Sequence, residues 1–255
     1  MGKVIAIINQ KGGVGKTTTA VNLAACLGYK DKKTLIIDSD AQGNATSGLG
    51  IEKNSFEKSI YNCFINPDDV HSAIIKTKYK NLFILPSSPD LSGIEIELAY
   101  EDNREFFMKS FIEKIKDEFD YILIDAPPAL GILTINILTA ADSVIIPIQC
   151  EYYALEGLSQ LTYSLKAVRK KLNKELSIEG ILPTMFDGRT NLSIQVLDEL
   201  KSYFPDKLFK SVIPRNVRLS EAPSYGEPII KFDITSKGAQ SYLSLAKELI
   251  SKNQT

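Results

Sequence analysis

Several residue types that mark other protein classes are scarce in this sequence. Its 255 residues include no tryptophan, one histidine and three cysteines. The cysteines stand far apart without C-x-x-C spacing, so we expect free thiols in a reducing compartment and no iron–sulfur cluster. No apolar run approaches the ~18 residues of a membrane span, and an expected strand begins near Lys3, which leaves no room for a secretion signal. These absences predict a cytoplasmic protein.

An excess of charge of one sign is also absent. Lysine and arginine number 30 against 31 aspartates and glutamates, which gives a net charge of −1 with histidine neutral. No global field therefore draws the chain toward nucleic acid or an anionic membrane, and any contact with DNA must come from a local cluster. With 44% hydrophobic and 24% charged residues, the composition is globular, and the length suits one α/β domain over residues 1–255.

A glycine-rich loop stands between an expected strand and an expected helix. The apolar run 4–8 predicts a buried strand, and residues 20–27 predict a helix. Glycines let successive backbone N–H groups converge on an anion, Lys16 can reach terminal phosphates, and the Thr17 hydroxyl can ligate Mg²⁺. We therefore predict a nucleoside triphosphate site formed by Lys11, Gly12, Gly13, Val14, Gly15, Lys16, Thr17 and Thr18.

Lys11 departs from the common phosphate-loop pattern. Gln10 stands where that pattern has its first glycine, and a second lysine follows it directly. Two ammonium groups around one loop repel each other unless phosphate charges lie between them. Lys11 is therefore either a second phosphate contact or a solvated lysine at the mouth of the loop.

Carboxylates follow two expected strands. Residues 34–38 and 121–125 are short apolar runs that end in Asp38 and Asp125, and Asp40 lies on the same side of the extended chain as Asp38. One carboxylate can serve Mg²⁺ while another orients or deprotonates the attacking water. Alternatively, Asp38 or Asp40 is a helix cap or a turn residue without a role in chemistry.

The order of strands and helices predicts a doubly wound α/β fold. Besides the runs above, strands are expected over 81–86, 143–148 and 178–185, and helices over 95–100, 104–118, 158–172 and 235–252. Strands that alternate with helices form a mostly parallel sheet with helices on both faces. The glycine loop and the carboxylates that follow the strands then meet at one edge of the sheet, as in P-loop nucleotide-binding proteins.

These blocks resemble the deviant Walker A ATPases, and within them the ParA/Soj chromosome- and plasmid-partitioning proteins. The resemblance rests on residues 11–18, 38–44, 124–128, 149–157 and 213–223 and covers nearly the whole chain. It implies ATP and Mg²⁺ as cofactors, an ATP hydrolase, and a homodimer in which Lys11 reaches the phosphates of the partner subunit. Lys16 would bind phosphate, Asp40 would position the water, and the metal side would comprise Thr17, Asp38 and Asp125.

The same resemblance implies residues around the base and a DNA surface. Thr184, Met185, Pro214 and Asn216 are expected near adenine. Arg189 and Arg218 match positions that contact DNA phosphates in Soj-like proteins, with Lys201, Lys207, Lys210 and Arg215 as nearby candidates. Binding would not depend on DNA sequence, the location would be the nucleoid, and a ParB/Spo0J-type partner would stimulate hydrolysis.

Alternatives remain for several segments. A MinD-like protein acts on membranes, but the polar residues 251–255 lack an amphipathic tail, so no membrane partner is expected. An orphan ParA-like protein that positions protein cargo is a further alternative. The basic residues from Lys166 to Lys174 are a solvated helix end or a DNA contact. Tyr152 and Tyr153 belong either to a subunit interface or to the core.

Overall fold

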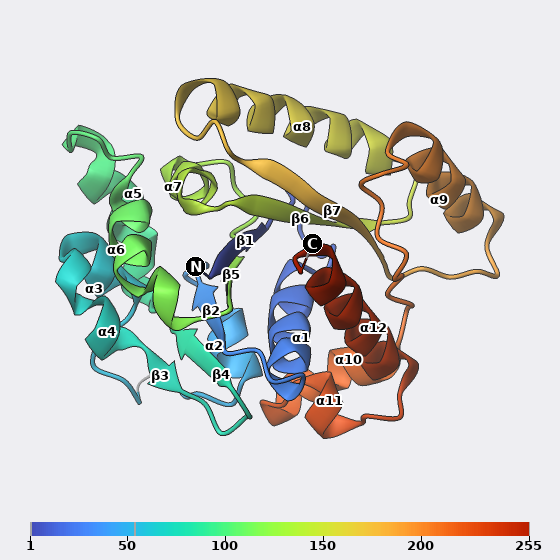
Figure 1. The fold of residues 1–255 in the computed structure, drawn as a ribbon, viewed down its shortest axis with the longest axis horizontal. Helices are drawn as coiled ribbons and strands as arrows, with labels where there is room; N and C mark the ends of the chain where they lie inside the picture. Colours follow the sequence, from blue (N-terminus) through green and yellow to red (C-terminus); the bar gives the residue numbers. More distant parts are fainter. Residues whose placement is uncertain (1, 54, 255) are drawn as a thin grey trace.

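The structure, a computed structural model, describes residues 2–53 and 55–254. Seven strands in this part of the chain form one sheet in the order β3-β4-β2-β5-β1-β6-β7 (Figure 1). All neighbouring strands run parallel except the edge pair β3 and β4. The strands are β1 (Lys3–Ile7), β2 (Thr34–Asp38), β3 (Ile75–Lys76), β4 (Leu82–Leu85), β5 (Tyr121–Asp125), β6 (Ser143–Gln149) and β7 (Ser177–Thr184).

Helices cover both faces of this sheet (Figure 1). Alternate strand residues point to opposite faces, so β1 places Val4 and Ala6 in one core and Ile5 and Ile7 in the other. One face carries α3 (Ile60–Ile65), α4 (Val70–Ala73), α5 (Ile94–Glu97), α6 (Phe107–Ile115), α7 (Ile132–Ala140), α8 (Ala154–Lys171) and α9 (Asn191–Tyr203). The other carries α1 (Lys16–Tyr29), α2 (Asn44–Gly48), α10 (Val217–Glu221), α11 (Ile229–Phe232) and α12 (Lys237–Lys252). The predicted doubly wound, mostly parallel fold is confirmed.

Short 3₁₀ turns join several of these elements. They are η1 (Pro67–Asp69), η2 (Pro89–Gly93), η3 (Leu98–Tyr100), η4 (Lys116–Glu118) and η5 (Ala222–Tyr225). Among the described residues, no helix is long and apolar enough to cross a bilayer.

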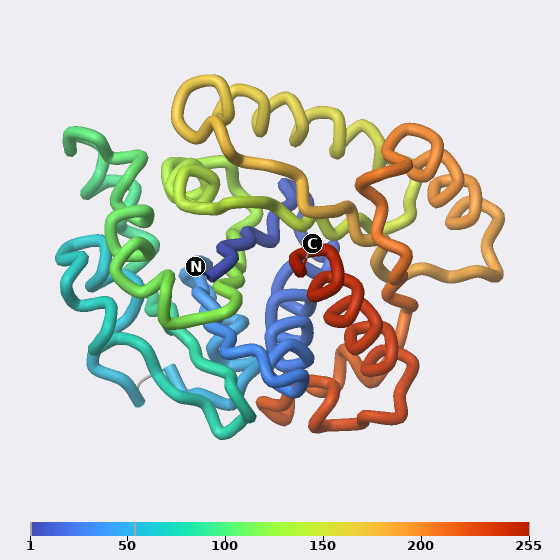
Figure 2. The backbone as a smooth tube through the Cα atoms, in the orientation of Figure 1, coloured from blue at the N-terminus to red at the C-terminus, as the bar shows by residue number. Residues whose placement is uncertain are grey.

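Helix α1 is buried on almost all sides because it lies between the sheet and α12. The C-terminal helix runs beside the blue α1 in Figure 2, and the hydroxyls of Thr19 and Tyr242 are 3.1 Å apart across this contact. At the other end of α1, a Cβ at Gly28 would overlap the Lys80 carbonyl oxygen, so α1 also packs closely against the loop before β4. The end of the chain therefore holds the helix that follows the glycine loop.

Most of the predicted elements are confirmed, but some helices differ from the predictions or were not predicted. The strands predicted over 34–38 and 121–125 are β2 and β5 with the same bounds. The helix expected over 104–118 is shorter in the structure: α6 begins at Phe107 and ends at Ile115, and η4 continues it to Glu118. Helix α8 begins at Ala154, earlier than expected, and the sequence pattern did not predict α9.

The parallel strands bring the chemically active segments to one sheet edge. The glycine loop follows β1, and β5 pairs with both β1 and β2. In that register Asp38 stands directly opposite Asp125. The ends of three neighbouring strands therefore surround the entry to α1, which is where ligands bind in open α/β sheets.

Candidate nucleotide and metal site

The glycine loop is an open cradle in front of α1. Gly13 and Gly15 have φ values of 73° and 89°, which a residue with a Cβ rarely adopts. A Cβ added to Gly12 or Gly13 would meet nothing within 4 Å, so the space above the loop is free. Within the described residues no side chain caps the start of α1, and its first N–H groups and positive dipole end can therefore bind an anion.

Lys16 is buried beside this cradle. Its Nζ donates a hydrogen bond to the carbonyl oxygen of Lys11 at 3.0 Å. Burial lowers the pKa of the Lys16 ammonium, while the negative charges of Asp125 and Asp40 oppose that shift. A buried ammonium facing two carboxylates and the glycine cradle is arranged to gain from bound phosphate.

Asp38 and Asp125 are both fully buried, and within the described residues Asp38 is held by three hydrogen-bond donors, whereas Asp125 has none in good geometry. Its carboxylate accepts from the Thr46 N–H at 2.8 Å, the Thr46 hydroxyl at 2.7 Å and the Asp40 N–H at 3.3 Å. Burial nevertheless raises the pKa of Asp38 to about 6, and the charge of Asp40 adds to this shift. Asp38 is therefore held in place by three donors that restrict its access to a metal ion.

Neither carboxylate oxygen of Asp125 has a hydrogen-bond partner in the described part of the chain. Burial and the charge of Asp38 raise the pKa of Asp125 well above its ordinary value, while the nearby Thr17 hydroxyl and Lys16 ammonium oppose the shift. A buried carboxylate without donors is unfavourable unless a cation or a proton neutralises it. Of the three residues predicted for the metal, Asp125 has the freest oxygens.

The residues at this edge fit Mg²⁺ bound together with phosphate. Among the described residues no three His, Cys, Asp or Glu side chains are grouped to hold a metal by themselves. Mg²⁺ does not require such a group, because it commonly takes one or two protein oxygens together with phosphate oxygens and waters. Thr17, in the first turn of α1, and Asp125 could supply those protein ligands.

Asp40 lies at the rim of a cavity of about 250 Å³ over the glycine loop. It accepts a hydrogen bond from the Gln42 N–H at 2.9 Å, so it is a turn residue as well as a cavity residue. The cavity is lined by Gly12, Gly13, Gly15, Lys16, Thr17, Thr18, Asp40, Asn44, Pro128 and Met185. Asp40 is therefore the half-buried carboxylate that faces the space where a terminal phosphate and a water would meet.

A second cavity of about 250 Å³ continues from the first and shares Gly15, Thr18 and Met185 with it. Thr184 lines this cavity, and its hydroxyl donates to the Val14 carbonyl oxygen at 2.8 Å. The complete lining is Gly15, Thr18, Thr184, Met185, Ile213, Pro214, Arg215, Asn216, Leu219, Ser220 and Tyr242. All four residues predicted near the base line this cavity, which adjoins the cavity over the glycine loop.

A larger hollow of about 590 Å³ lies at the opposite edge of the sheet. Its charges are largely satisfied within the protein: Lys116 and Asp142 are 2.8 Å apart, and Lys3 and Glu179 are 3.5 Å apart. The unsatisfied carboxylate and the anion cradle both lie at the other edge, so the cavities over the glycine loop are the candidate site.

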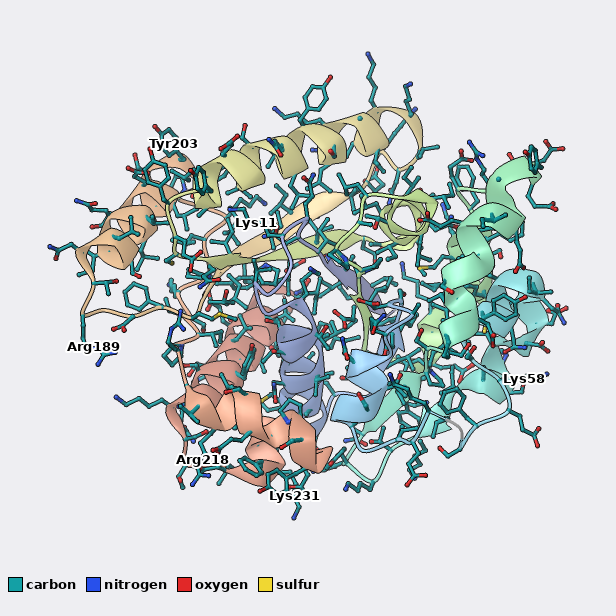
Figure 3. All side chains as sticks on the ribbon, turned by 180° about the vertical axis from the view of Figure 1, so that it is seen from behind. Lys11, Lys58, Arg189, Tyr203, Arg218 and Lys231 are labelled. Carbon is teal, nitrogen blue, oxygen red and sulfur yellow. The ribbon has the colours of Figure 1, made fainter. Side chains whose placement is uncertain are left out.

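The side chain of Lys11 extends to the start of α8 (Figure 3). Its Nζ donates to the Tyr153 carbonyl oxygen at 2.8 Å and lies 5.7 Å from the centre of the Tyr153 ring. A Cβ at Gly157 would lie 3.3 Å from the Lys11 Cε, so this glycine makes room for the lysine. Tyr152 and Tyr153 are exposed, and the alternative that they belong to the core is wrong.

The two arginines predicted to contact DNA lie along the same side of the molecule (Figure 3). Arg189 forms a two-point ion pair with Asp187, with Nε to Oδ1 at 2.8 Å and Nη2 to Oδ2 at 2.7 Å. This pair lowers the pKa of Asp187 to about 2. Arg218 pairs with Glu221 at 3.0 Å and Asp233 at 3.5 Å. Both arginines are exposed, yet local carboxylates already occupy part of each guanidinium.

Several site residues were not predicted from the sequence. Thr46 holds Asp38, Asn44 lines the phosphate cavity, and Leu219 and Tyr242 line the base cavity. Asn44 and Leu219 fall within blocks that carry the resemblance, where neither was singled out as a site residue. Thr46 and Tyr242 carry no local signal, because their contacts arise from the packing of α2 and α12 against the strand ends.

Comparison with known proteins agrees with this geometry. The family model of an AAA domain matches residues 2–178. The sporulation initiation inhibitor protein Soj of Bacillus subtilis (strain 168) is 59% identical over 249 residues, 98% of each chain. The chromosome partitioning protein ParA of Myxococcus xanthus (strain DK1622) is 52% identical over 253 residues, which cover 99% of this chain and 89% of that protein.

A solved structure with the same fold contains a nucleotide. The cobyrinic acid a,c-diamide synthase of Mycobacterium smegmatis, with bound ADP and magnesium, is 33% identical with a TM-score of 0.87, covering 100% of this chain and 96% of that one. Taken with the sequence relatives, this establishes the class as a P-loop nucleotide-binding fold. Within that class, the chain belongs to the Soj/ParA family of partitioning ATPases.

Proposed function

We propose that this chain binds ATP with Mg²⁺ and hydrolyses it, and that residues 1–255 act as one ATPase domain. The observation that carries the proposal is the unsatisfied buried carboxylate of Asp125 next to an open glycine cradle. Mg²⁺ would neutralise charge on the phosphates and polarise the bond that is cleaved. Thr17 and Asp125 would hold it, and Asp38 would stabilise the site from its fixed position beside Asp125.

The hydrolytic step would depend on Lys16 and Asp40. Lys16 would neutralise charge on the terminal phosphate, and Asp40 would orient the water and accept its proton. The water oxygen then bonds to the terminal phosphorus as the bond to the bridging oxygen breaks, which yields ADP and inorganic phosphate. Few positive groups surround the cavity in one subunit, so turnover is expected to be slow until other charges complete the site.

Lys11 supports an ATP-dependent homodimer. Its ammonium lies on the Tyr153 carbonyl oxygen and not on its own cradle, and both residues are at the surface. Once released from Tyr153, this long side chain would reach the phosphates of a second subunit across the sandwiched nucleotides. Each site would then gain a cation from its partner, and hydrolysis would remove the charge that holds the pair together.

The dimer would bind DNA without sequence preference and act in chromosome or plasmid partitioning. Arg189 and Arg218 would contact DNA phosphates. A single, nearly neutral subunit offers few such cations, and a dimer would present twice as many to the DNA. A ParB/Spo0J-type partner would stimulate hydrolysis and thereby release the protein from the nucleoid. The family relationship and the exposed arginines support this part of the proposal.

Nucleotide and DNA binding by matched variants tests the proposal. Lys16→Ala should abolish binding of a fluorescent ATP analogue with Mg²⁺, and with it DNA binding. Arg189→Ala and Arg218→Ala should each weaken binding to a random DNA duplex by about tenfold at low salt while ATP binding and dimerisation remain. Arg104→Ala, on an exposed segment of the opposite side, is the control. Loss of dimerisation in an arginine variant would show that the arginine is structural.

A further inference from the structure

The segment that includes α5 and η3 exposes large apolar side chains. Ile94 and Leu98 anchor it in the core, whereas Ile96 is 76% exposed and Tyr100 is 96% exposed. Leu130, in the loop between β5 and α7, is 44% exposed. We call Ile96, Tyr100 and the carboxylates that flank them from Glu95 to Asp102 the acidic ridge. Exposed apolar side chains that are flanked by charged residues are a feature of protein-binding surfaces.

The ridge carries negative charge that the protein itself does not neutralise. Its exposed carboxylates are Glu95, Glu97, Glu101 and Asp102, and none of them forms an ion pair within the described residues. Arg104, which follows the ridge in the chain, lies 3.7 Å from Glu105 and donates to the Ala99 carbonyl oxygen at 2.6 Å. In a chain with a net charge of −1, this is a local excess.

The ridge touches the loop that leads away from the metal site. A Cβ at Gly131 would lie 1.9 Å from the Glu95 carboxylate oxygen, so Glu95 packs directly on the backbone of Gly131. The same loop begins at Asp125 and includes Pro128, which lines the phosphate cavity. Helix α5 also contacts α7, the helix that the loop enters (Figure 1). A molecule bound to the ridge would therefore press on a loop that borders both the phosphate and the metal.

We infer that the acidic ridge is the docking surface for a cationic segment of a partner protein, one that carries apolar side chains among its lysines or arginines. Ile96, Tyr100 and Leu130 would bury the apolar side chains, and the carboxylates would pair with the cations. A second copy of this chain is a poorer occupant, because a two-fold contact would bring carboxylates against carboxylates. The inference rests on the proposed function, since it gives the stimulating partner a place to act.

Peptide binding to surface variants tests this inference. The probe is a fluorescein-labelled synthetic peptide of 18 lysines and leucines, with a glutamate–leucine peptide as its control. Two double variants of the ridge should each lower the affinity for the lysine–leucine peptide at least tenfold, as measured by fluorescence anisotropy. They are Ile96→Ser/Tyr100→Ser and Glu101→Lys/Asp102→Lys. The matched variant Tyr203→Ser/Glu199→Lys removes a comparably exposed tyrosine and a carboxylate from α9 and should change binding less than twofold.

Three outcomes decide the inference. Equal losses in the ridge and α9 variants, or no loss in either, would overturn it. A ridge variant that loses ATP-dependent dimerisation but retains peptide binding would show that a second copy occupies the ridge, and would overturn it as well. Failure of the unmodified chain to dimerise with ATP would instead refute the proposed function, while peptide binding would still report on the ridge.

Discussion

Asp38 and Asp125 face each other from neighbouring parallel strands, but their carboxylates are stabilised differently. Asp38 is bonded by Thr46 and the Asp40 N–H, whereas both oxygens of Asp125 lack donors within the described chain. The fold therefore keeps one member of the pair fixed and leaves the other to be neutralised. A neutral residue at position 125 should therefore change two measurable quantities: the stability of the nucleotide-free protein and the stabilisation that Mg²⁺ adds in the presence of ATP.

Asp125→Asn should stabilise the nucleotide-free protein. An amide of the same shape removes a buried negative charge next to Asp38, with an expected gain of about 1–3 kcal/mol in unfolding free energy. For a chain of this size that corresponds to roughly 2–4 °C in Tm for each kcal/mol. The same variant should lose the additional stabilisation that Mg²⁺ gives in the presence of ATP. Thermal unfolding with and without Mg²⁺ and ATP measures both effects, and a destabilised nucleotide-free variant would contradict this account.

The same pair predicts how stability depends on pH. Because burial raises the pKa values of Asp38 and Asp125, the folded state binds protons more tightly than the unfolded state does. Their contribution to stability is complete below the unfolded pKa of about 4 and is lost as pH rises through the folded pKa, which is about 6 for Asp38. Urea unfolding should thus show a larger stabilisation by Asp125→Asn at pH 7.5 than at pH 5. An equal effect at both pH values would argue that folding does not raise the pKa of Asp125.

Gly157→Ala should favour the dimer by displacing Lys11. The added methyl would lie 3.3 Å from the Lys11 Cε and crowd the lysine where it rests on the Tyr153 carbonyl. We expect ATP-dependent dimerisation at a severalfold lower protein concentration, measured by analytical ultracentrifugation. Ser159→Ala is the control, because it also improves helix propensity in α8 at an exposed position without approaching Lys11. An equal shift in both variants would assign the effect to helix stability.

Asp187→Asn should tighten DNA binding. The Asp187 carboxylate occupies two N–H groups of Arg189 and cancels its charge, so a DNA phosphate must compete with it. Neutralising Asp187 should raise the affinity for a random duplex about threefold to tenfold at low salt and steepen the dependence on salt. Asp206→Asn removes an exposed carboxylate that forms no ion pair within the described chain, and it should have a smaller effect. Weaker DNA binding in Asp187→Asn would mean that the ion pair positions Arg189 productively.

Sequence periodicity predicted the strands and the active loop because each carries a local signal. The apolar runs ending in Asp38 and Asp125 and the glycines before Lys16 specify their own conformation, and parallel pairing then brings them together. Contacts made by packing had no such signal: Thr46 reaches Asp38, and Tyr242 reaches Thr19 from the far end of the chain. The rest of the site depends on where α2 and α12 pack, which a pattern within one segment does not encode.

The molecular mass of Asp40→Ala in solution tests the central claim most directly. If ATP joins two subunits and Asp40 serves the water, this variant should bind ATP, fail to hydrolyse it and remain dimeric in size-exclusion chromatography with light scattering. Adding Lys11→Ala to the same variant should return it to a monomer that still binds ATP. An ATP-bound Asp40→Ala that stays monomeric at every protein concentration would contradict the account.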